Sequence, residues 1–146
     1  MLRMLAVALS GLFLLACEPG EGAGGPALQV QGGWARAMPL LDDGEGAGTN
    51  SAVYLLLRND GSEGDRLTGG STPAAEAVQL HESRVVNDIM RMERIDGLEI
   101  PPGDSVELKP GGRHIMLLGL TRSLVVGEEI ELTLHFLKAG DLAVTI

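Results

Sequence analysis

Two histidines and two methionines in the second half of this sequence have the side chains and the spacing of a metal site. Ten residues separate His81 from Met92, and twenty-one separate Met92 from His114. Met116 follows His114 with a single residue between them. Imidazole nitrogens and thioether sulfurs are soft ligands, and thioethers favour Cu(I) over Zn²⁺, Mg²⁺ or Ca²⁺. The pattern therefore predicts a site for Cu(I).

The last two of these residues share one short apolar segment. Residues 114–120 read HIMLLGL, which predicts a buried β-strand. Side chains two residues apart in a strand point to the same face, so His114 and Met116 should lie together. This strand offers one His/Met pair, and His81 and Met92 are the other two candidate ligands.

A hairpin of the segments 75–83 and 88–95 would supply those ligands. With its tip at residues 86–87, His81 lies directly opposite Met92, with Cβ atoms about 4.5–5.5 Å apart. All four ligands converge if the 114–120 strand, which carries His114 and Met116, lies near this hairpin. The register is an assumption, because the tip sequence is not a strong two-residue turn and a one-residue slip would separate the pair.

Other residues of the same types fit ordinary structural roles. Methionine often fills gaps in a core, and this role is predicted for Met90, which the motif skips, and for Met38. His135, alone on a later strand, is predicted to be structural or exposed. Trp34 is predicted to pack in the core or at its rim. Two arginines that flank the motif are predicted on the surface: Arg91 and Arg113.

The rest of the chain predicts a turn-rich β-protein without a helix pattern. Short alternating or apolar segments are separated by Gly, Pro, Asn and Asp. The expected strands span residues 28–37, 51–58, 65–69, 75–83, 88–95, 105–108, 114–120, 129–137 and 142–146. The predicted fold is all-β, an antiparallel Greek-key β-sandwich or partly open barrel.

The N-terminus has the form of a bacterial lipoprotein leader. Arg3 precedes an apolar run that is too short for a membrane-spanning helix of about 20 residues. Residues 1–16 are predicted as the signal peptide, and Cys17, the only cysteine, as the lipidated residue. Residues 17–27 form a flexible tether, and 28–146 the domain. The alternative is an ordinary secreted protein with an incidental cysteine.

This leader predicts an extracytoplasmic, lipid-anchored protein. Glu18 follows the cysteine instead of the Asp that is associated with inner-membrane retention, so the outer membrane is favoured if the source is Gram-negative. With Cys17 acylated, no disulfide forms, and no thiolate is left as a metal ligand or a nucleophile.

Composition argues against two other classes of function. The net charge is −9, and the sequence has no basic face for phosphate groups, so nucleic acid is not an expected partner. No nucleophile–base pair and no motif for a redox cofactor stands out, so the chain is not predicted to be an enzyme.

The spacing His-x10-Met-x21-His-x-Met resembles the periplasmic copper chaperone family called PCuAC. Family-like text also occurs at residues 33–37, 52–55 with 59–61, 78–82, 90–92 and 106–112. The resemblance covers roughly residues 28–138. It implies a cupredoxin-like barrel that binds Cu(I) through His81, Met92, His114 and Met116. It also implies copper delivery to the CuA domain of cytochrome c oxidase, alongside Sco-type proteins.

The sequence departs from the family at several positions. Many members have an accessory methionine just after the first histidine, where this chain has Glu82 and Ser83. Many have Asn-Gly at the hairpin tip, where this chain has Asn87 and Asp88. The sequence ends without the His/Met-rich tail of some members, so no second copper site is expected there.

Two other classes of function remain as alternatives. A blue-copper electron carrier needs a Cys thiolate with two histidines, and Cys17 belongs to the leader. A metal-free β-sandwich lipoprotein with a structural or assembly role is the other alternative, and failure to retain copper would favour it.

Overall fold

The computed structural model describes residues 24–40 and 48–146. The predicted signal peptide, Cys17 and the first part of the predicted tether lie outside these residues. Within the two described ranges, no helix has the length and the apolar character that crossing a membrane requires.

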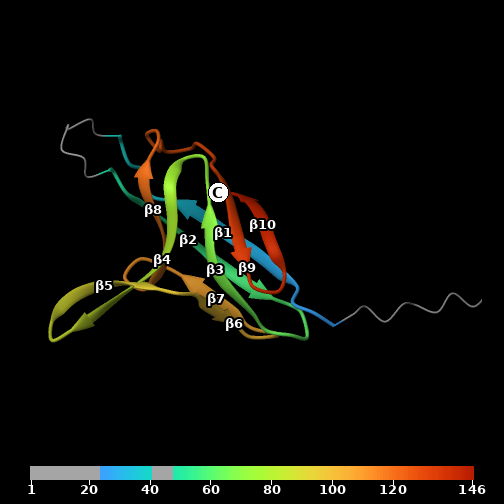
Figure 1. Ribbon diagram of the computed structural model, residues 1–146. Helices are drawn as coiled ribbons and strands as arrows, with labels where there is room; N and C mark the ends of the chain where they lie inside the picture. The colour runs from blue at the N-terminus through green and yellow to red at the C-terminus, as the bar shows by residue number, and fades with distance from the viewer. Residues whose placement is uncertain (1–23, 41–47) are drawn as a thin grey trace, which may run out of the picture.

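Ten strands make up the described part of the chain (Figure 1). They are β1 (Leu28–Ala35), β2 (Ser51–Asn59), β3 (Asp65–Ser71), β4 (Ala75–Val86), β5 (Ile89–Ile95), β6 (Leu98–Ile100), β7 (Ser105–Leu108), β8 (Arg113–Leu120), β9 (Glu131–Phe136) and β10 (Gly140–Thr145). All pairs are antiparallel, in the order β1-β2-β8-β4-β3-β9-β10, and the sheet curls into a nearly closed barrel. The predicted all-β antiparallel fold is confirmed.

The sheet order brings distant segments together. β8 lies between β2 and β4, although 26 residues (87–112) separate it from β4 in the chain. The short strand β6 pairs with β3 and was not predicted, because three residues give no alternation to recognise. β5 pairs only with β4, so the β4–β5 hairpin extends beyond the body of the barrel (Figure 1).

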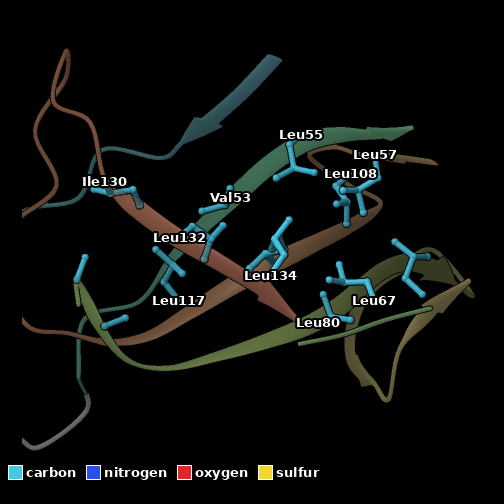
Figure 2. Close-up of a cluster of buried hydrophobic side chains, with 14 of the residues drawn as sticks. Val53, Leu55, Leu57, Leu67, Leu80, Leu108, Leu117, Ile130, Leu132 and Leu134 are labelled. Carbon is cyan, nitrogen blue, oxygen red and sulfur yellow. The ribbon is translucent and has the colours of Figure 1, made fainter. Parts of the chain in front are cut away.

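Alternating residues of these strands fill the interior of the barrel. Val53, Leu55 and Leu57 of β2 point into one apolar cluster with residues of β8 and β9 (Figure 2). Fully buried members from those two strands include Ile115 and Leu117 of β8 and Leu134 of β9. Burying each such side chain contributes roughly 1.5–3 kcal/mol. This core fixes which face of each strand is left for a functional site.

Asp65 anchors the turn between β9 and β10 to the start of β3. The residue is buried, and its Oδ1 accepts N–H bonds from Arg66 at 2.7 Å and Lys138 at 2.9 Å. Its Oδ2 accepts a bond from the Ala139 N–H at 2.8 Å. Burial alone would raise the pKa of Asp65, but these donors and the Lys138 charge hold it below the ordinary 3.8.

Replacing Asp65 by Asn should destabilise the domain by about 1–3 kcal/mol at pH 7, because an amide cannot accept all three bonds. The lowered pKa means that the carboxylate stabilises the fold above the unfolded-state pKa, and that this stability is lost as pH falls through the folded-state value. Urea unfolding at pH 7 and pH 3 should therefore show a larger difference between the two proteins at pH 7. An equal difference at both pH values would argue against this role of the carboxylate.

Candidate metal centre

The centre of the site is a pair of histidines on neighbouring strands. β4 and β8 pair so that His81 lies directly opposite His114, and their ring centroids are 5.9 Å apart. In the same register Met116 lies opposite Gln79, two residues along each strand and therefore on the same face. The condition for convergence, that the 114–120 strand lies near the hairpin, is met, because β8 pairs with β4.

The hairpin register differs from the predicted one. The turn consists of Asn87 and Asp88, whose φ angles of 52° and 60° are the left-handed values of a type I′ turn. A tip at residues 86–87 would force the β-branched Val86 into this region, which Asn and Asp tolerate far better. The turn therefore pairs Val86 with Ile89 and shifts the predicted register by two residues.

This shift separates His81 from Met92, but it leaves both side chains on the same face of the hairpin. Met92 lies opposite Ser83, and His81 lies opposite Arg94, so the predicted direct pairing of His81 with Met92 is wrong. A shift of two residues preserves the face, because side chains alternate with a period of two. Met92 is therefore diagonal to His81 and still shares its face.

Three methionines and one histidine line the same pocket. This pocket has a volume of about 270 Å³, and Met90, Met92, His114 and Met116 all contribute to it. Its other walls include Tyr54 and Ser83. His114 is only 3% exposed, whereas Met92 is 53% and Met90 59% exposed. The predicted core role of Met90 is therefore wrong, and the outer wall of the pocket faces solvent.

The hydrogen bonds of the two rings define which nitrogens are free. Nδ1 of His114 lies 3.1 Å from the Gly112 carbonyl oxygen, which only accepts, so Nδ1 carries the proton and Nε2 the lone pair. Nε2 of His81 lies 3.0 Å from Oε1 of Gln79 and donates to it. Nδ1 of His81 is then the basic nitrogen, and it is buried without a hydrogen-bond partner.

The surroundings of His81 favour its neutral form. Burial lowers the pKa of His81 from its ordinary value of 6.5, and the neighbouring His114 and the Arg94 charge lower it further. A neutral imidazole is the form that binds a metal ion. The first histidine of the motif is therefore held in its metal-binding protonation state below the pH at which an ordinary histidine becomes charged.

Aromatic side chains border the same face. The ring centroid of Tyr54 lies 6.2 Å from that of His114, and Trp34 packs against Tyr54 at 4.5 Å. The Tyr54 hydroxyl accepts a 3.1 Å bond from Arg36. Trp34 is 49% exposed, so it is a rim residue and not part of the core. Gln79 and Tyr54 were not among the predicted site residues, and the pairing of β8 with β4 and β2 places both at the border of the site.

The remaining predicted residues lie elsewhere. Nδ1 of His135 is 2.6 Å from an Asp141 oxygen on the neighbouring strand, which fits the structural role predicted for it. Arg91 and Arg113 are exposed, as expected. Met38 is half-buried against the core. In the described ranges, no group of three or more His, Cys, Asp and Glu side chains is placed to hold a metal ion.

The nearly closed antiparallel barrel, with its two histidines and its methionines on one face, is a domain of the PCuAC class. The chain belongs to the LpqE-like lipoprotein family, whose model, described as "Putative lipoprotein LpqE-like", matches residues 28–146. A curated relative, "Putative lipoprotein Lxx21020" of Leifsonia xyli subsp. xyli (strain CTCB07), is 34% identical over 146 aligned residues. That alignment covers 93% of this chain and 82% of the relative.

Solved structures show the same relationship. The copper-bound PCuAC domain from PmoF2 is 29% identical, with a TM-score of 0.64 over 84% of this chain and 92% of that domain. The solution structure of Cu(I)-DR1885 from Deinococcus radiodurans is 28% identical, with a TM-score of 0.60 over 86% of this chain and 80% of the other. The resemblance to the PCuAC family is confirmed.

Proposed function

We propose that this protein is an extracytoplasmic, lipid-anchored copper chaperone. Its cargo is Cu(I), and its ligands are His81, Met92, His114 and Met116. The observation that carries the proposal is the direct pairing of the two histidines across β4 and β8, with both methionines on the same face. The copper named in the PmoF2 and DR1885 structures supports the same cargo.

The donor atoms of the site fit Cu(I). Nδ1 of His81 is a buried acceptor without a partner, which costs free energy until a cation or donor binds it. Gln79 and the Gly112 carbonyl orient the two rings through their other nitrogens, as outer hydrogen bonds do in metal sites. Neutral thioethers complete a soft, uncharged ligand set that favours Cu(I) over harder ions.

The exposure of the site suits a carrier. His114 is buried and holds the inner side of the site, whereas Met92 is half exposed and lies at the solvent side. A ligand from another protein reaches such a site without unfolding of the core, so copper passes by ligand exchange. No proton leaves a thioether during the exchange, and no catalysed reaction is part of this function.

The proposal extends to location and recipient. Residues 1–16 act as the signal peptide, Cys17 carries the lipid, and residues 17–27 tether the domain 28–146. The lipoprotein descriptions of the family and of the Leifsonia relative support the anchor. The proposed recipient is the CuA domain of cytochrome c oxidase, with Sco-type proteins as partners. The protein is placed in the periplasm, at the outer membrane if the source is Gram-negative.

A Cu(I) competition titration against a chromophoric chelator tests the function directly. We expect one tight equivalent per chain, followed by transfer to an isolated CuA domain. Binding without transfer would retain the copper site and remove the CuA domain as recipient. If no copper is retained, the alternative of a metal-free structural lipoprotein takes its place.

The affinity for Cu(I) should be nearly constant above pH 7 and should weaken as pH falls below about 6.5, because protons then compete for the imidazole lone pairs. Because the pKa of His81 is lowered, protons compete with copper for this imidazole only at a lower pH than for an ordinary histidine. The same titration between pH 7.5 and 5 measures this dependence. His135→Ala, on another part of the sheet, should keep the profile, whereas constant affinity down to pH 5 would argue against imidazole ligands.

A further inference from the structure

Met90 occupies a position that the four-residue motif does not explain. In the β4–β5 hairpin it lies opposite Val85, two residues from Met92 and on the same face. Met90 is therefore two residues nearer than Met92 to the tip of the hairpin, which extends beyond the body of the barrel (Figure 1).

The exposure of Met90 argues against a packing role. Its side chain is 59% exposed and that of Val85 63%, so neither is part of the core. The same side chain lines the pocket that contains Met92, His114 and Met116. Met90 is therefore an exposed thioether that borders the pocket of the proposed copper ligands.

We infer that Met90 is a third thioether donor, through which Cu(I) enters and leaves the site. This inference rests on the proposed function and adds an outer ligand to it. During exchange, a Cu–S bond to Met90 forms as a bond to an inner ligand, such as Met116, breaks. Copper stays Cu(I), and no proton moves, because every thioether is neutral. The exposed pair Met90 and Met92 then presents the ion to a partner.

Methyl NMR of the full chain in detergent, with ¹³C-labelled methionine methyl groups, tests this donor role. Single Met→Leu variants assign the signals. On addition of one equivalent of Cu(I), we expect the signals of Met92, Met116 and Met90 to move. The signal of Met38, which lies at the bridge to Leu124, should stay in place and serves as the internal reference.

Kinetics test the transfer role. Met90→Leu keeps the apolar volume and removes the sulfur from an exposed position, so the fold should be unaffected. We expect Cu(I) removal by the chelator bathocuproine disulfonate to slow about fivefold, while the affinity changes less than about threefold, because an outer donor lowers the barrier to exchange more than it stabilises the bound state. Met38→Leu should leave the rate unchanged.

The results separate this inference from the proposed function. Movement of the Met92 and Met116 signals with a stationary Met90 signal overturns the role of Met90 and keeps the copper site. An unchanged rate in the Met90 variant also overturns it. If no methionine signal moves, the proposed function fails together with the inference.

Discussion

Replacing Met92 and Met116 together by leucine should weaken Cu(I) binding about a thousandfold, or about 4 kcal/mol. Leucine retains the apolar volume of both side chains and removes only the sulfur atoms. The site would keep its two imidazoles, which suit Zn²⁺ as well as copper, and would lose the thioethers that favour Cu(I). A Cu(I) competition titration of both proteins measures the difference.

Met38→Leu is the matched control for this variant, because that methionine is half-buried away from the site. It should bind copper like the unaltered protein. Thermal unfolding of the apo-proteins should differ little, since the exposed Met92 contributes little to the core. If the double variant binds Cu(I) as tightly as the unaltered protein, the thioethers are not ligands. The copper proposal then loses its main chemical argument.

Replacing Asn59 by alanine should destabilise the domain by about 3–5 kcal/mol, because its fully buried amide uses all four of its hydrogen-bonding positions. Nδ2 donates to the carbonyl oxygens of Glu63 at 2.8 Å and Ile100 at 3.2 Å. Oδ1 accepts from the N–H groups of Ala27 and Gly61, each at 3.0 Å. Alanine leaves four backbone groups without these partners.

Urea unfolding at pH 7 measures this loss. Asn50→Ala is the matched control, because that amide accepts an exposed bond from the Gly119 N–H and its loss should cost about 1 kcal/mol or less. The folded fraction of the Asn59 variant should still bind Cu(I), since the network lies at the far end of β2 from the residues that line the pocket. Similar stabilities for the two variants would mean that solvent replaces the buried network.

Alternation in the sequence was sufficient to assign side chains to faces. Side-chain alternation along residues 88–95 predicts Met90 and Met92 on one face and Ile89 and Arg91 on the other, and the observed register agrees. The error in the hairpin register left these faces unchanged, because the shift is two residues. The sequence did not determine the position of the turn. Nearby registers compete there, and the observed one is that in which Asn87 and Asp88 take positive φ angles.

Burial at the site was not predictable from residue type. Met90 was expected in the core, yet it is 59% exposed. For Trp34 the core and its rim were both expected, and the residue lies at the rim, 49% exposed. Their exposure follows from where their strands lie: β5 pairs only with β4, and Trp34 lies in the edge strand β1, directly opposite Tyr54 of β2. Hydrophobicity alone does not distinguish an inner from an outer face when a sheet has apolar residues on both.

By itself, the sequence determined the chemistry of the donors, the antiparallel β-class and the face that each donor takes along its own strand, because these depend on residue type and on a period of two. The tertiary structure alone decided that β8 lies against β4, so that His114 meets His81 with Gln79 and Tyr54 beside them. That pairing joins residues far apart in the chain, and its register is set by packing of the whole core, which no local pattern contains.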